Sequence, residues 1–164
     1  MCSFFSGITA MADDRLTHYW SRKTDSHAEI MAEFNIRQDD HVGQDRMALW
    51  ELIPIPSEDG LAYLDGYVFK CDGREPSWWA ERLPEIEAAA RRGLLTRIIK
   101  PGETIELIEG GTYLLLDGEA TVKIVTGGDV WSHGTSSLTI ETITGGNVWS
   151  YGTSSLTIKN DNRV

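Results

Sequence analysis

Two consecutive segments of the chain are almost identical, and they constrain the fold more than any other feature. Residues 126–143 read TGGDVWSHGTSSLTIETI and residues 144–161 read TGGNVWSYGTSSLTIKND. The sequence therefore repeats every 18 residues, without insertion. Residues 108–125 form a fainter copy that keeps a glycine, an aromatic residue and a threonine in register. Tandem repeats stack on one another as the coils of a solenoid. The sequence therefore predicts three coils of equal length, over 108–125, 126–143 and 144–161.

Each coil divides into two halves, a Gly-Gly turn before Val-Trp-Ser and a Thr-Ser-Ser turn before Leu-Thr-Ile. This pattern predicts two short strands joined by tight corners, and hence a narrow parallel β-solenoid. Side chains alternate along a strand, so Leu138 and Ile140 are expected to fill the interior. The spacing also aligns Lys123, Glu141 and Lys159 in one column, where opposite charges on neighbouring strands are favourable.

Aromatic residues form a second feature of the repeats. The repeat spacing aligns them in two adjacent columns, Tyr113 with Trp131 and Trp149, and Leu115 with His133 and Tyr151. If the neighbouring valines point inward, both columns point outward as an aromatic stripe, and exposed apolar patches usually mark contact sites. Cover by the rest of the chain and an inward-facing ladder are the alternatives. The neighbours of His133 in its column make a metal site there unexpected.

The region before the repeats, residues 1–100, is expected to form a separate α+β module, followed by the solenoid over 101–164. A capping box, Ser26 to Glu29, predicts a helix that ends near Asn35. A second helical region begins at Pro76 and is expected to divide at Pro84 and end at Gly93. The expected strands cover 4–10, 16–20, 47–55, 61–71 and 94–99.

Composition limits the function classes. The net charge is −10, which disfavours direct binding to nucleic acid. The apolar runs are shorter than a membrane helix needs, and the N-terminus lacks the basic start of a signal peptide. We therefore expect a soluble, cytoplasmic protein without membrane contact. The glycine turns lack the repeated aspartates of calcium-binding rolls, so neither a metal nor a cofactor is expected.

An enzymatic alternative rests on Cys2. If Met1 is removed, Cys2 carries a free amine beside its thiol, and such residues act as nucleophiles in some hydrolases and transferases. His27, with Asp25 two residues before it, is the candidate base. Because Met-Cys is only a dipeptide and histidines at helix starts are usually structural, a non-enzymatic protein is the favoured interpretation.

Two further pairs of residues are candidates for ligand contacts. Trp78 and Trp79 are candidates for stacking on a base, although paired aromatic residues at a helix start are more often core anchors. Arg91 and Arg92 are candidates for holding an anion.

Several of these segments together resemble a family of uncharacterised proteins from bacteriophages and bacterial mobile elements. The resemblance is carried by the opening MCSFFSGI, by Thr24-Asp25-Ser26-His27 before a helix, by Pro76-Ser77-Trp78-Trp79, and by tandem repeats that contain Ser-Ser. In that family an N-terminal module precedes a variable number of short repeats. The resemblance implies a phage or prophage setting and does not supply a reaction.

The last strand of the repeats completes the prediction. After Leu156 and Ile158 the sequence KNDNRV is polar and short, so the last coil is expected to offer unpaired backbone groups to another copy. We therefore expect a homo-oligomer that acts as an interaction or self-assembly protein, with a host protein as a possible further partner. The alternatives are a Cys2-dependent hydrolase or transferase, and an anti-defence protein that sequesters a host enzyme or a nucleotide signal.

Overall fold

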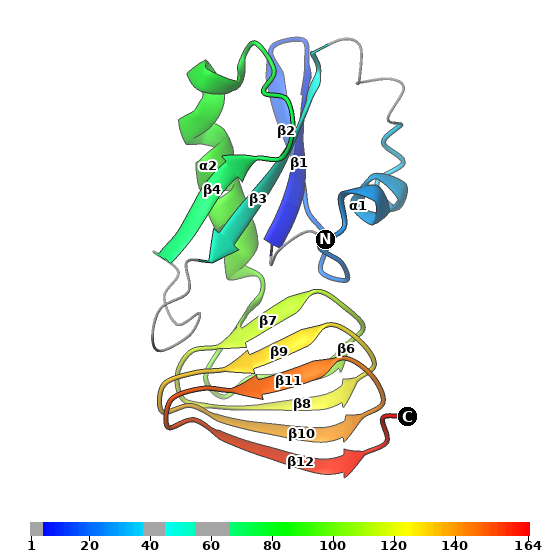
Figure 1. Ribbon diagram of the computed structural model, residues 1–164, viewed down its shortest axis with the longest axis vertical. Helices are drawn as coiled ribbons and strands as arrows, with labels where there is room; N and C mark the ends of the chain where they lie inside the picture. Colours follow the sequence, from blue (N-terminus) through cyan, green and yellow to red (C-terminus); the bar gives the residue numbers. More distant parts are fainter. Residues whose placement is uncertain (1–4, 38–44, 55–65) are drawn as a thin grey trace. The chain divides into compact units, whose positions relative to one another are not determined.

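The computed structural model describes residues 5–37, 45–54 and 66–164. These residues form two compact units, one with residues up to 53 together with 67–95, and one with residues 96–164 (Figure 1). The sequence placed the boundary after residue 100, so the second unit begins slightly earlier than expected.

The first unit contains one four-stranded sheet and two helices. Its strands are β1 (Phe5–Ala12), β2 (Arg15–Tyr19), β3 (Met47–Pro54) and β4 (Tyr67–Cys71), in the order β2-β1-β3-β4. β1 runs antiparallel to β2 and to β3. All four strands lie where the sequence predicted strands, and the predicted extensions over 55 and 61–65 fall outside the described residues.

The core of this unit is centred on Trp50, which is fully buried. Its ring lies 5.8 Å from Phe5 and 5.9 Å from Phe69 between centroids, and Phe69 stacks on Trp79 at 5.6 Å. The indole N–H of Trp50 donates to Thr9 Oγ1 over 3.0 Å. The sheet is therefore packed through a connected group of aromatic rings.

The helices differ in detail from the sequence prediction. Helix α1 (His27–Glu33) begins after Ser26 as expected, but the Ser26 side chain makes no capping hydrogen bond, and Glu29 accepts the Thr24 hydroxyl. Helix α2 (Trp79–Leu95) is one continuous helix that contains Pro84 instead of dividing there. A Cβ atom on Gly93 would lie 2.9 Å from the Phe5 and Trp20 rings, so this glycine permits close packing and does not end the helix.

The second unit is a β-solenoid of about four turns, whereas three coils were expected. Each turn adds one strand to each of two parallel sheets, ordered β11-β9-β7-β5 and β12-β10-β8-β6 (Figure 1). The strands are β5 (Ile98–Ile99), β6 (Thr104–Ile108), β7 (Thr112–Leu115), β8 (Glu119–Val125), β9 (Asp129–Ser132), β10 (Ser137–Ile143), β11 (Asn147–Ser150) and β12 (Ser155–Asp161). The additional turn, β5 with β6, lacks the repeat sequence. It is recognised only because β5 pairs with β7 and β6 pairs with β8.

The register of the turns is not uniform. Thr121, Thr139 and Thr157 pair at the predicted spacing of 18, but Leu114 pairs with Trp131 and Tyr113 with Val130, one residue out of step. A shift of one residue reverses the face on which a side chain lies. Tyr113 therefore packs in the interior and is 5 % exposed, so its predicted place in an outward aromatic stripe was wrong.

The predicted charge column is confirmed and is longer than expected. Lys159 Nζ lies 3.6 Å from Glu141 Oε1, and Lys123 Nζ lies 2.8 Å from Glu106 Oε1 one turn earlier. Glu106 and, more weakly, Glu141 raise the pKa of Lys123. Four residues of alternating sign thus run across one sheet, as an in-register parallel stack favours.

The corners explain why the repeat keeps its glycines and serines. Gly128 has a φ of +79°, and a Cβ atom there would lie 2.3 Å from the Gly111 carbonyl oxygen of the preceding turn. Inside the opposite corner, the Ser132 and Ser136 hydroxyls are 2.9 Å apart and buried. The next turn repeats this contact between Ser150 and Ser154.

Candidate functional site

The last turn of the solenoid, β11 with β12, is the more exposed of the two coils that are nearly identical in sequence. Val130 and Leu138 are fully buried in the preceding turn, while their counterparts Val148 and Leu156 are only partly buried. Ile158 is partly buried as well, and it packs against the same core. Two of the predicted assembly residues, Leu156 and Ile158, thus lie at the end of the stack.

Ring stacking joins the aromatic residues on the β9–β11 side. Trp131 stacks on Trp149 at 5.7 Å and on Tyr151 at 5.3 Å between centroids. Tyr151 also stacks on His133 at 5.2 Å. His133 is 1 % exposed, whereas Trp149 is 45 % exposed. The predicted column of Leu115 with His133 was wrong, because Leu115 pairs with Ser132. Of the predicted stripe, Trp149 is the member that offers a large exposed surface.

In the first unit, His27 is the predicted site residue whose surroundings are clearest. It is 6 % exposed, its Nε2 lies 3.1 Å from the Trp50 carbonyl oxygen, and its Nδ1 lies 3.3 Å from Asp72 Oδ2. A carbonyl oxygen only accepts hydrogen bonds, so Nε2 carries a proton and donates it. Asp72, which the sequence prediction did not include, is therefore a carboxylate that faces this imidazole.

A buried carboxylate completes this group. Glu51, in the middle of β3, is 6 % exposed, and its Oε2 lies 3.5 Å from Lys70 Nζ. Three potential ligand atoms, one from each of His27, Glu51 and Asp72, all lie within 4.8 Å of one another. Sequence reasoning missed both carboxylates, although a glutamate inside the apolar run ALWELIP was a usable signal.

The two remaining residues of the catalytic hypothesis are Cys2 and Asp25. Cys2 lies outside the described residues. The charge of Asp25 acts on Tyr67, whose pKa is raised mainly by burial and further by this charge.

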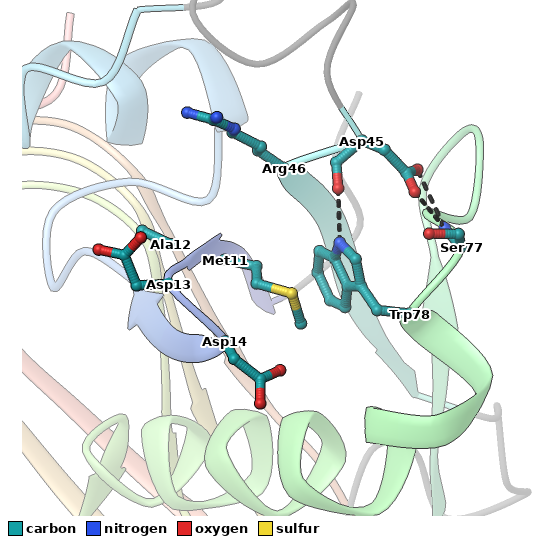
Figure 2. Close-up of a pocket in the computed structure, with 8 residues that line it drawn as sticks. All are labelled: Met11, Ala12, Asp13, Asp14, Asp45, Arg46, Ser77 and Trp78. Carbon is teal, nitrogen blue, oxygen red and sulfur yellow. Dashed lines mark hydrogen bonds between the residues drawn. The ribbon is translucent and has the colours of Figure 1, made fainter.

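Of the candidate ligand-contact residues, Trp78 lines a pocket with a volume of about 460 Å³ (Figure 2). The pocket lies between the β1–β2 turn and the start of α2, and Met11 points toward the Trp78 ring, while Arg46 points away (Figure 2). The Trp78 indole N–H donates to the Asp45 carbonyl oxygen over 2.5 Å. Because Asp13, Asp14 and Asp45 line this pocket, it is unsuited to the phosphate of a nucleotide.

The other candidates in this group have structural contacts. Trp79 is 4 % exposed and belongs to the core. Arg91 forms a 2.7 Å ion pair with Glu87 and donates to the Tyr67 carbonyl oxygen. Arg92 is exposed on the last turn of α2. These contacts do not assemble an anion site from Arg91 and Arg92.

Neither helix of the described part of the chain has the length and apolar character required to cross a membrane. Comparison of the chain with protein-family models, with curated proteins and with solved structures finds no match.

Proposed function

We propose that this chain is a non-enzymatic self-assembly protein in which two copies pair through the outer edge of the last solenoid turn. The difference in burial between the last two turns carries this proposal. Their sequences are nearly identical, yet Leu138 is 0 % exposed while Leu156 is only partly buried, and Trp149 is 45 % exposed. Pairing at this edge would cover apolar surface that the equivalent positions of the preceding turn already bury.

A second copy of the chain is the occupant that this edge fits. The outer edge of β10 is covered by β12, a strand of almost the same sequence. Since the edge of β12 repeats that chemistry, it is a template for another strand of this type. In a parallel ladder, successive N–H groups point to opposite sides. The Ser155 N–H donates inward to the Ser136 carbonyl oxygen over 2.9 Å, so the Leu156 N–H points to the outer edge.

Asp161 favours a closed dimer over an open filament. It pairs with Ile143, in a column whose earlier members are the buried Val125 and Ile108. An open stack of further coils would enclose this carboxylate in an apolar core, at a high cost in free energy. A two-fold antiparallel pairing along the whole of β12 instead sets Asp161 of each copy across from the exposed Ser155 of the other, and not within a continued apolar column.

In the phage or mobile-element setting that the sequence resemblance implies, such a dimer would present two N-terminal units to a host protein. Bivalent presentation increases apparent affinity without any new contact.

The test compares the mass of the wild type with that of Leu156→Pro and Leu156→Ala by light scattering over a range of concentrations. Both variants lose the Leu156 side chain, but only proline removes the outward N–H. We expect a wild-type dimer, a dimer weakened modestly by alanine, and a monomer with proline at a melting temperature close to that of the alanine variant. A wild type that stays monomeric at the highest concentration, or a proline variant that still dimerises, refutes the proposal.

A further inference from the structure

We propose that His27, Glu51 and Asp72 form a binding site for a divalent transition-metal cation. The three residues come from the first position of α1, from the middle of β3 and from the position after β4. Their ligand atoms lie within 4.8 Å of one another, so small side-chain adjustments bring them to a common centre. One imidazole and two carboxylates suit Zn²⁺ or Mn²⁺.

The orientation of the imidazole is the first argument. Its Nε2 donates to the Trp50 carbonyl oxygen over 3.1 Å, which leaves Nδ1 as the metal-binding nitrogen. Histidines that bind metals usually donate their other N–H to a carbonyl or carboxylate, because this contact fixes the tautomer and the ring. Nδ1 lies 3.3 Å from Asp72 Oδ2, so a metal ion placed between these two atoms would bind both side chains.

The charge of the cluster is the second argument. Glu51 is 6 % exposed, and Lys70 Nζ lies 3.5 Å from its Oε2. Two carboxylates face one ammonium group here, in a site where burial makes uncompensated charge costly. A divalent cation supplies the compensation and binds all three side chains.

The exposure of the cluster indicates how a metal would enter. The Asp72 side chain is 44 % exposed, whereas the His27 and Glu51 side chains are almost fully buried. A cation bound here would have two inner ligands and one at the surface, with its remaining coordination positions toward water. This geometry is that of an accessible site, in contrast to a four-ligand structural site.

The experiment uses the full chain, stripped with a chelator and titrated with MnCl₂ followed by electron paramagnetic resonance, and with ZnCl₂ followed by calorimetry. We expect one equivalent of metal per chain and a raised melting temperature. Asp72→Asn, which changes an exposed side chain and keeps its size, is expected to weaken binding by at least about tenfold. Glu51→Gln is expected to do the same, and Glu75→Gln, on the exposed segment after β4, serves as the matched control.

Two results would overturn the proposal. They are the absence of binding of either metal at millimolar concentration, and binding that Asp72→Asn and Glu51→Gln both leave unchanged. Because Asp72→Asn alters a partly exposed side chain, its effect on metal affinity remains measurable even if Glu51→Gln fails to fold.

Discussion

Asp161 pairs with Ile143 across the last two strands of the solenoid, at the end of a column that is otherwise apolar. Its carboxylate forms an ion pair with the Arg163 guanidinium at 2.5 Å. This contact lowers the pKa of Asp161, so the group stays charged at neutral pH. Inward-pointing charge on an edge strand is a known means of preventing strand addition. The solenoid thus ends in a turn that resembles the others in sequence but differs in the chemistry of one interior position.

Asp161→Leu is expected to convert limited association into open-ended assembly. The substitution continues the apolar column, so another coil can stack without enclosing a carboxylate. Light scattering should show species larger than a dimer that increase with concentration, and electron microscopy should show filaments. Asp161→Asn is the control, because an interior amide still disfavours stacking. Equal behaviour of the leucine and asparagine variants would contradict this role of Asp161.

Glu141→Lys is expected to destabilise the solenoid by about 0.5–2 kcal/mol, because it replaces two favourable cross-strand pairs by two repulsive ones. Glu141 lies between Lys123 and Lys159, and the three side chains are partly exposed. The measurement is chemical unfolding in low salt and in about 1 M salt, where the difference from the wild type should shrink. A difference that is independent of salt would indicate a cause other than charge.

Comparing Gly128→Ala with Gly102→Ala separates the cost of a steric clash between turns from the cost of a left-handed backbone. Both glycines have a φ of +79°, but a Cβ atom at Gly128 would lie 2.3 Å from the Gly111 carbonyl oxygen, while none of the described atoms lies within 4 Å of one at Gly102. Gly102→Ala should cost about 1–2 kcal/mol for the left-handed backbone alone. Gly128→Ala should cost at least about 2 kcal/mol more, because neighbouring turns must separate. Similar melting temperatures for the two variants would count against tight stacking at this corner.

Thr9→Val is expected to destabilise the first unit by about 1–3 kcal/mol, because it leaves the buried indole N–H of Trp50 without its acceptor. The Thr9 hydroxyl also lies 2.9 Å from His18 Nδ1, and burial is the main cause that lowers the pKa of His18. The Thr9 hydroxyl donates to the neutral imidazole in this contact, so its loss should raise the pKa of His18. NMR titration measures this pKa. Thr9→Ser keeps the hydroxyl and should restore both stability and pKa.

Cys71 is expected to react slowly with alkylating reagents. Burial, and then the charges of Glu75 and Asp72, raise its pKa from 9.0 to about 11. At pH 9 about 1 % of this thiol is ionised, against about half of an ordinary one. The folded state therefore holds the proton more tightly than the unfolded state, so the contribution of Cys71 to stability falls as the pH rises from 9 toward 11.

The measurement is the rate of iodoacetamide labelling of Cys71 in a Cys2→Ser variant, with Cys71→Ser as the counterpart that reports Cys2. Rapid labelling of Cys71 would contradict its raised pKa. Fast reaction of Cys2 alone would favour the enzymatic alternative at that residue.

The repeat by itself determined the type of fold in the second unit. A constant repeat offset with alternating apolar positions forms parallel coils, and the Lys123–Glu141–Lys159 alignment predicted the register of β8, β10 and β12 correctly. Local signals also located β1 to β4 and the start of α1, because strand alternation and helix entry depend on nearby residues.

Tertiary structure decided what depends on contacts between distant residues. The offset of 17 between β7 and β9 turned Tyr113 inward, and no local pattern distinguishes it from an offset of 18. Close packing against Phe5 and Trp20 kept Gly93 inside α2. Likewise, His27, Glu51 and Asp72 are brought together only when α1, β3 and β4 pack around Trp50, so sequence spacing alone did not place Glu51 and Asp72 beside His27.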